Sequence, residues 1–198
     1  MIIGKKEFIV NELQYTIRSA RAEDAQKLSA LRLKIDGETE YMDREKGEDF
    51  IDAPGFEQQI KEDTEKKRNL FLVAEVQDRL AGFSRCEGTD LKRSSHKVEF
   101  GVCVLKEFWG YGIGKHLLQQ SLSWADTNGM KKISLNVLET NERAISLYKT
   151  YRFEAEGILK KEKLLSDRNY YNMVVMGRFH DKKRHCICAV SFVINALL

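Results

Sequence analysis

The chain has 198 residues, a length that favours one domain with at most a small appendage. Hydrophobic residues make up 42% of it and charged residues 32%, which is an ordinary globular balance with enough apolar residues for a sizeable core. Lys and Arg number 33 against 30 Asp and Glu, and the resulting net charge of +3 is too small to indicate nucleic-acid binding by itself.

The sequence also lacks the apolar segments of a secreted or membrane-spanning protein. Residues 1–10 carry Lys5, Lys6 and Glu7 and have no long apolar core, unlike a secretory signal. No apolar run reaches the roughly 18 residues of a transmembrane helix. We therefore expect a cytoplasmic protein.

Hydrophobic periodicity predicts one strand and two helices in the N-terminal third. Alternation predicts a strand over residues 15–20, and helical spacing predicts a helix over residues 22–37. Residues 37–55 are acidic and irregular and contain the only proline of the chain. Residues 56–68 are strongly charged, so we expect at best a surface helix there.

The rest of the chain is predicted to alternate between strands and helices. Further strands are expected over residues 70–76, 80–86, 97–105, 133–137, 153–164 and 170–176, and further helices over residues 114–128 and 141–151. Hairpins together with a crossover favour a mixed sheet with helices on both faces. The prediction is thus an α/β (α+β) fold with a mixed central sheet of about seven strands.

A glycine-rich loop joins the strand at 97–105 to the following helix, and it reads Trp109-Gly110-Tyr111-Gly112-Ile113-Gly114. Glycines let a backbone approach a ligand closely, and the helix that follows offers unpaired N–H groups and a positive dipole end. The loop therefore suits a pyrophosphate, although it could also be a simple turn. It is not a P-loop, because His116 stands where Ser or Thr is required.

A second motif begins the helix at 141–151 and reads Asn141-Glu142-Arg143-Ala144-Ile145-Ser146-Leu147-Tyr148. Asn141 can cap the helix, and Tyr148 lies on its apolar side. Taken singly, each is better explained as a helix cap and a core tyrosine than as a functional residue.

The two motifs, in this order and with a strand between them, resemble the GNAT N-acetyltransferase superfamily. Its acetyl-CoA motif is a strand, Arg/Gln-x-x-Gly-x-Gly/Ala and a helix, and its next motif is Asn-x-x-Ala-x-x-x-Tyr. Residues 102–114 and 141–148 match these patterns, and the resemblance covers roughly residues 14–179. It departs at Trp109, which stands where the family usually has Arg or Gln.

The resemblance implies an N-acetyltransferase with acetyl-CoA as cosubstrate and no metal. An amine would attack the thioester directly, in a ternary complex held between two splayed strands. The implied cofactor-binding residues are Val102, Cys103, Val104, Trp109, Gly110, Tyr111, Gly112, Ile113, Gly114, Lys115, Asn141, Arg143 and Ala144. Trp109 cannot supply the positive charge that Arg would bring to the CoA phosphates, and Arg143, Lys115 or Lys149 can supply it instead.

Two residues are candidates for proton transfer. Tyr148 matches the family tyrosine that points at the sulfur, so it is the candidate acid. Glu99 is the candidate base, through a water, although alternation places it on the face opposite Val98 unless a bulge re-aims it. Glu99 is otherwise an ordinary exposed or paired strand residue. Cys103 has no base beside it in sequence and is expected to be packing rather than a nucleophile.

The acceptor amine is left open by the sequence. Six acidic residues make the 37–55 segment attractive to a cationic amine, or they simply solvate a loop. They are Glu38, Glu40, Asp43, Glu45, Glu48 and Asp49. Three functions are compatible with the motifs: an enzyme acting on a small amine, a protein N-terminal acetyltransferase of the ribosomal-protein type, and a non-catalytic acyl-CoA-binding regulatory module. Retention of Asn141 and Tyr148 disfavours the third.

The predicted GNAT domain covers residues 1–180 and leaves a tail of unusual composition. Residues 181–185 are basic and residues 186–198 are almost wholly apolar, yet too short to cross a bilayer. The tail is an interface element of a homodimer, a membrane-surface anchor, or sequence foreign to the natural protein. Cys186 and Cys188 lack the second ligand pair that a zinc site needs.

Overall fold

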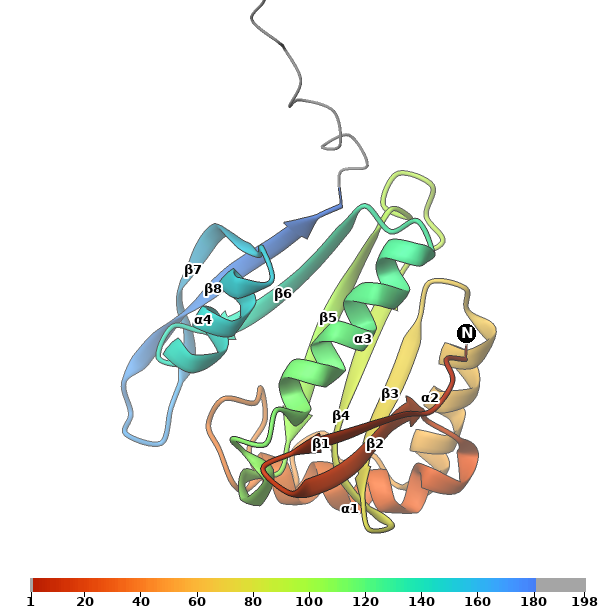
Figure 1. Ribbon diagram of the computed structural model, residues 1–198. Coiled ribbons are helices and arrows are strands. Elements are labelled where there is room, and N and C mark those ends of the chain that lie inside the picture. Colours follow the sequence, from red (N-terminus) through yellow and green to blue (C-terminus); the bar gives the residue numbers. More distant parts are fainter. Residues whose placement is uncertain (1, 181–198) are drawn as a thin grey trace, which may run out of the picture.

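The computed structural model describes residues 2–180, and it confirms the predicted mixed α/β architecture (Figure 1). In chain order the elements are β1 (Lys6–Val10), β2 (Leu13–Ser19), η1 (Ala22–Asp24), α1 (Ala25–Asp36), α2 (Ala53–Glu65), β3 (Leu70–Val76), β4 (Arg79–Gly88), β5 (Lys97–Val104), η2 (Lys106–Phe108), α3 (Ile113–Thr127), β6 (Lys132–Leu138), α4 (Glu142–Thr150), β7 (Glu154–Leu164) and β8 (Tyr170–Phe179). Predictions for the tail, residues 181–198 with Cys186 and Cys188, lie outside the described residues.

The strands form one eight-stranded sheet in the order β1-β2-β3-β4-β5-β6-β8-β7. All neighbours are antiparallel except β5 and β6, which are parallel and pair over only three residues. Beyond those pairs the two strands diverge, and Figure 1 shows the sheet split into two wings at this point. The split leaves a gap between β5 and β6, and the candidate functional site lies around this gap.

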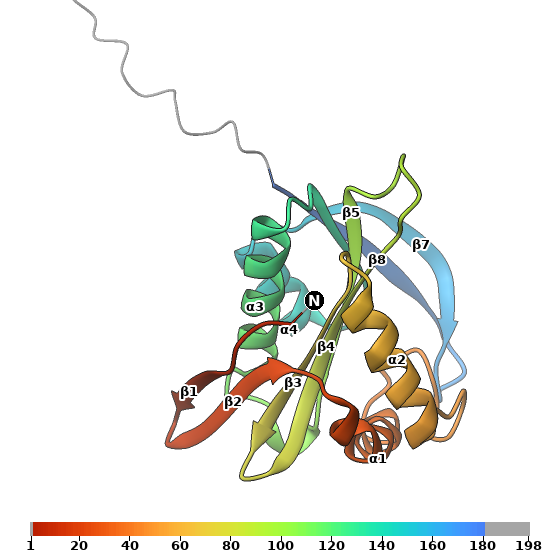
Figure 2. The same cartoon turned by 90° about the vertical axis from the view of Figure 1, so that its right-hand side faces the viewer.

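Helices cover both faces of the sheet, as predicted. Figure 2 shows α3 and α4 on one face and α1 and α2 on the other. The first face buries a large cluster that includes Leu117, Leu118 and Trp124 of α3. The second buries a smaller cluster around Leu28 of α1 and Phe56 of α2. Removing these apolar side chains from water stabilises the two layers.

The sheet has one strand more than predicted, because β1 pairs with β2 at the edge. Two charged residues at its start, Lys6 and Glu7, obscured it in the sequence. The turns at both N-terminal hairpins are also unusual, because they have positive φ without glycine: 48° and 66° at Asn11 and Glu12, 46° and 65° at Gln77 and Asp78. Two successive positive φ values match the right-handed twist of the paired strands.

The second helix begins earlier and is better buried than predicted. Asp52 accepts a hydrogen bond from the backbone of Gly55 at 2.9 Å, and Pro54 occupies the first turn, where its missing N–H costs nothing. Phe56 and Ile60 pack into the core, and the carboxylate of Asp63 is buried. The charged surface of α2 concealed this buried stripe in the sequence.

Among the helices of residues 2–180, none combines the length and apolar character that a bilayer crossing demands.

The contact between β4 and β5 yields a stability prediction. A Cβ atom added at Gly82 would lie 2.6 Å from the carbonyl oxygen of Cys103, so the backbone must shift. Gly82→Ala should therefore lower the free energy of unfolding by about 1–3 kcal/mol, the usual cost of overpacking. Gly101→Ala is the control, since its Cβ would meet no atom within 4 Å, and it should change stability by less than about 0.5 kcal/mol. Denaturant unfolding compares the two, and equal stabilities would contradict the prediction.

Candidate active site

The candidate site is built around the gap between β5 and β6. The backbone N–H of Leu105 donates to the carbonyl of Ala81 on β4 at 2.9 Å. Because peptide groups alternate between the two edges of a strand, those of Val102 and Val104 face the other way, into the gap. An extended ligand can therefore pair with β5 where β6 has withdrawn.

Cys103 is oriented differently from its two neighbours. Alternation directs its peptide groups toward β4, and its side chain packs in the apolar cluster under α1 and α2. Burial raises the pKa of the Cys103 thiol, and of the Cys86 thiol to about 12, so both stay protonated and inert at neutral pH. Cys103 is thus packing in this structure and lies apart from the gap.

The glycine loop leads into α3 at the mouth of the gap. Gly110 and Gly112 have φ of 95° and 77°, values that favour glycine, and Gly112 is the N-cap residue of α3. The first turn of α3, from Ile113, directs backbone N–H groups without intrahelical partners into the loop. A Cβ atom at Gly110 would lie 4.0 Å from a guanidinium nitrogen of Arg143, so this cation stands beside the loop.

Trp109, the departure from the family pattern, has a structural role. Its indole N–H donates to the carbonyl of Val104 at 2.8 Å, and its ring stacks against Tyr41 with centroids 6.4 Å apart. The side chain thus ties the loop to the end of β5. It leaves the cationic role to Arg143 and to the exposed Lys115.

A buried aromatic group that sequence reasoning missed supports the loop from behind. The Tyr15 hydroxyl lies 3.0 Å from the carbonyl oxygen of Tyr111 and 2.7 Å from Nδ1 of His116, whose ring stacks on Phe8. Burial, followed by the charge of Lys115, lowers the pKa of His116, so the ring is neutral at physiological pH. With its proton on Nδ1, His116 donates to Tyr15, which in turn donates to the loop.

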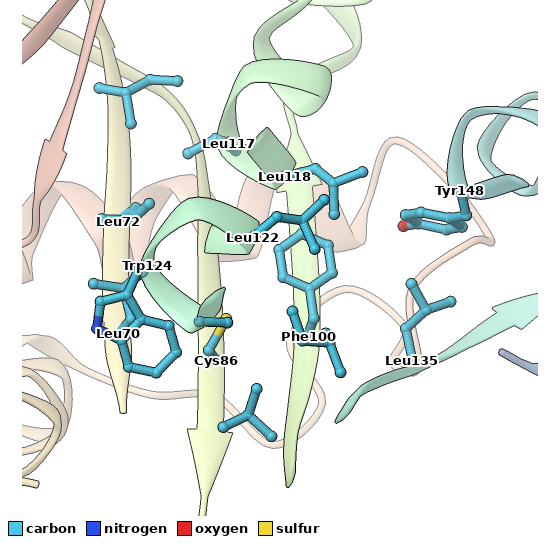
Figure 3. Close-up of a cluster of buried hydrophobic side chains, with 14 of the residues drawn as sticks. Leu70, Leu72, Cys86, Phe100, Leu117, Leu118, Leu122, Trp124, Leu135 and Tyr148 are labelled. Atoms are coloured by element: carbon cyan, nitrogen blue, oxygen red, sulfur yellow. The ribbon is translucent and has the colours of Figure 1, made fainter. Parts of the chain in front are cut away.

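The second motif lies across the gap from β5. Asn141 caps α4 as predicted, because its side-chain oxygen accepts from the backbone of Ala144 at 3.2 Å. Tyr148 is 8% exposed, and Figure 3 shows its phenol projecting from α4 toward β5, with the oxygen at the leading end. Among residues 2–180 no protein group engages that hydroxyl. Burial raises the pKa of Tyr148 to about 12, which keeps the phenol protonated.

Glu99 lies on the opposite face of β5 from Tyr148. The register between β4 and β5 is unbroken, so β5 has no bulge and Glu99 stays on the same face as Gly101. That face borders a cavity of about 620 Å³. Its lining residues are Asp43, Arg85, Glu87, Glu99, Phe100, Gly101, Asn136, Leu159, Glu162, Lys163 and Met173. Glu99 therefore faces a cavity of substrate size, and no β-bulge is needed to turn its side chain toward it.

The acidic 37–55 segment contributes less to this cavity than its composition suggests. Among the acidic residues of this segment only Asp43 is on the cavity wall. Others hold the segment in place: Glu38 accepts from the backbone of Lys106 at 2.8 Å, and Asp49 pairs with Arg32 at 3.0 Å. The other carboxylates of the wall, Glu87, Glu99 and Glu162, come from strands, and of these the sequence had indicated only Glu99.

The structure thus brings most of the predicted residues to two sides of one gap. The glycine loop, Arg143 and Tyr148 lie on the side of α3 and α4, and Glu99 borders the cavity on the other side. Such an arrangement can hold an elongated phosphate ligand across the sheet and meet its end from the cavity. Among residues 2–180, no group of three or more His, Cys, Asp or Glu side chains is placed to hold a metal ion.

Comparison with curated proteins points to one family. An L-amino acid N-acetyltransferase of Escherichia coli is 31% identical over 109 residues, which are 54% of this chain and 66% of that protein. An N-alpha-acetyltransferase of Sulfolobus acidocaldarius is 40% identical over 81 residues, which are 40% of this chain and 47% of that protein. The chain thus spans between about half and two thirds of the lengths of these relatives.

Solved structures and a sequence model of the family point to the same family as the curated relatives. A GNAT-family acetyltransferase of Streptococcus pneumoniae has the same fold, with a TM-score of 0.80 and 22% identity over 83% of this chain and 98% of that one. The sequence model of the acetyltransferase (GNAT) family matches residues 35–153, which include the glycine loop and the Asn141–Tyr148 motif. Since that match covers more than half of the sequence, the chain belongs to the acetyltransferase (GNAT) family.

Proposed function

We propose that the protein is an acetyl-CoA-dependent N-acetyltransferase in which a primary amine attacks the thioester directly. The observation that supports this most is the gap itself. A glycine-rich loop at a helix N-terminus and a buried phenol lie on one side of it, and a cavity bordered by a carboxylate lies on the other. The family membership gives the same reaction class independently.

The residues around the gap fit acetyl-CoA. Cβ atoms at Gly110 and Gly114 would meet no backbone atom within 4 Å, so the loop leaves open space in front of the α3 N-terminus. The unpaired N–H groups there and the Arg143 guanidinium would hold the diphosphate. The peptide groups of Val102 and the backbone N–H of Val104 would hold the pantetheine arm, whose amides pair as a strand does, while the carbonyl of Val104 stays bonded to Trp109.

The same edge of β5 can stabilise charge during the reaction. A backbone N–H near Val102 would donate to the acetyl carbonyl oxygen, which becomes negative as the amine adds. This donor belongs to a strand that is paired with β4 without interruption from Val98 to Val104, so it is fixed in advance. Such a donor has little reorganisation to undergo when charge develops.

Glu99 is placed to accept the proton of the incoming ammonium. It borders the cavity from which the amine would approach, and among residues 2–180 it has no ion-pair partner. Alkylamines have pKa values of about 10, so at neutral pH the acceptor arrives protonated and must lose a proton before it attacks. A water held by Glu99 can carry that proton.

Tyr148 is placed to stabilise the departing sulfur. A thiol has a pKa of about 8.5, well below the value of about 12 for this phenol. Complete proton transfer from Tyr148 to a thiolate is therefore uphill, and hydrogen-bond donation to the developing thiolate is its first contribution. The unengaged hydroxyl makes this donation possible without breaking an existing bond.

The loop assignment predicts the outcome of a charge insertion at Gly114. A Cβ at this position meets only the Val104 side chain, at 3.7 Å, so Gly114→Glu should fold while its carboxylate repels the diphosphate. Affinity for CoA in calorimetry should fall at least about tenfold, which corresponds to about 1.4 kcal/mol. Gly4→Glu is the control, since that position is exposed and open. Unchanged affinity in a folded Gly114→Glu variant would remove the loop from the site.

Amine-dependent release of free thiol from acetyl-CoA tests the proposed activity itself. Tyr148→Phe keeps the ring and loses only the hydroxyl, so turnover should fall by roughly 10²-fold with CoA affinity nearly intact. Tyr151→Phe is the matched control, because its hydroxyl accepts from Gln119 at 2.7 Å and should leave turnover nearly unchanged. No thiol release with any amine would reject the activity, and a fully active Tyr148→Phe enzyme would reject the role of Tyr148.

The role of Glu99 predicts a change in pH dependence. Glu99→Gln should lower turnover most near neutral pH, where the amine is protonated, and the deficit should shrink as pH rises toward the amine pKa of about 10. The pH–rate profiles of the two enzymes give the answer. If the profiles have the same shape, solvent is the base and Glu99 has no part in the proton transfer.

A further inference from the structure

We infer that the acceptor is a small aliphatic amine with a second positive charge, of the diamine or polyamine class, and that Glu162 binds the distal ammonium. This inference rests on the proposed function, because it names the substrate that would occupy the cavity beside Glu99. It follows from the charges of the cavity wall, from which of them are already paired, and from the shape of β7.

The first cation of the wall, Arg85, is fully engaged by the protein. Its guanidinium donates to the buried carboxylate of Asp63 through two bonds, of 2.5 and 3.0 Å. Its other terminal nitrogen lies 2.9 Å from Glu87. Arg85 therefore has no free face for the carboxylate of an amino-acid substrate.

The second cation of the wall, Lys163, is engaged as well. Its ammonium donates to the backbone carbonyl of Met42 at 2.8 Å and pairs with Asp43 at 2.6 Å, and its side chain is only 14% exposed. Recruiting Lys163 for a substrate carboxylate would break both contacts. The two cations thus hold the wall together and leave no positive charge to spare.

Two carboxylates of the wall, unlike its two cations, are unpaired among the described residues. Glu99 and Glu162 have no ion-pair partner among residues 2–180. The wall carries four acidic residues against two basic ones, so the cavity is left with an excess of negative charge. Two unpaired carboxylates in one cavity favour a ligand with two cationic groups, one near Glu99 where acetyl transfer occurs and one farther away.

The backbone of β7 is distorted where it carries Glu162 to the cavity. Between Leu159 and Lys163 the strand advances four residues while its partner β8 advances two, so β7 bulges. Within the bulge Lys161 has a φ of 54°, and its N–H donates to the side chain of Asn172 at 2.9 Å. Bulges re-aim side chains beside functional sites, and this one contains the unpaired carboxylate.

The surroundings of the cavity favour a small molecule over the terminus of a folded protein. Besides the contacts of Lys163, the backbone N–H of Ser166 donates to Glu40 at 3.0 Å, so the loop after α1 is fastened to the tip of the β7–β8 hairpin. Figure 2 shows the hairpin tip beside that loop. A bulky acceptor would have to separate them.

The first test measures thiol release from acetyl-CoA with acceptors that differ in charge. Putrescine and spermidine should give kcat/KM at least roughly tenfold above butylamine, because the distal ammonium gains a charge-assisted contact. Alanine and glutamate should be the poorest acceptors. Equal rates with putrescine and butylamine, or a preference for α-amino acids or for a peptide N-terminus, would overturn the inference while leaving the acetyltransferase activity established. Absence of thiol release with every acceptor would instead reject the proposed function.

The second test assigns the distal contact to Glu162. Glu162→Gln should raise KM for putrescine roughly tenfold and leave the KM values for butylamine and acetyl-CoA unchanged. Glu154→Gln is the matched control, because it removes the same charge from the same strand outside the cavity wall, and its kinetics should equal those of the wild type. An equal loss for putrescine and butylamine, or an unchanged KM for putrescine in Glu162→Gln, would remove Glu162 from acceptor recognition.

Discussion

The structure depends on one backbone constraint, which is that β5 and β6 pair for three residues and then part. Buried peptide groups must be paired, so a strand edge exposed inside a sheet is a site that a ligand can complete. Figure 1 shows that α3 and α4 start from either side of this gap. The helix N-terminus that suits phosphate and the helix that carries Tyr148 are therefore placed by the same feature.

Alternation along β5 divides the chemistry between two faces. Phe100 and its apolar neighbours pack under α3 (Figure 3), while Glu99 and Gly101 border the cavity beyond the sheet. Because the two faces meet only at the gap, a thioester and an amine can be brought together there from opposite directions. The environments also suit the two roles: the phenol is buried and uncharged, whereas the carboxylate borders a polar cavity.

Local patterns made the fold and the positions of its two motifs predictable. The glycine loop and the Asn141–Tyr148 motif are each contiguous, so their places at the starts of α3 and α4 could be inferred from neighbouring residues. The cavity wall could not, because it joins residues from β4, β5, β7 and the loop after α1. The partners of Arg85 and the bulge that holds Glu162 arise from tertiary pairing. The support of the glycine loop by Tyr15 was hidden for the same reason, since roughly a hundred residues of sequence separate Tyr15 from His116.

The bulge in β7 has a consequence for how such a protein can diverge. It lies on the last strand of the sheet, outside both apolar clusters, so insertions or substitutions there leave the packed layers intact. The glycine loop, which we propose to hold the nucleotide end of the cosubstrate, lies in a different part of the chain. If β7 contacts the acceptor as we propose, substitutions of a few residues on this edge strand can change acceptor preference. The packed layers and the glycine loop can stay the same.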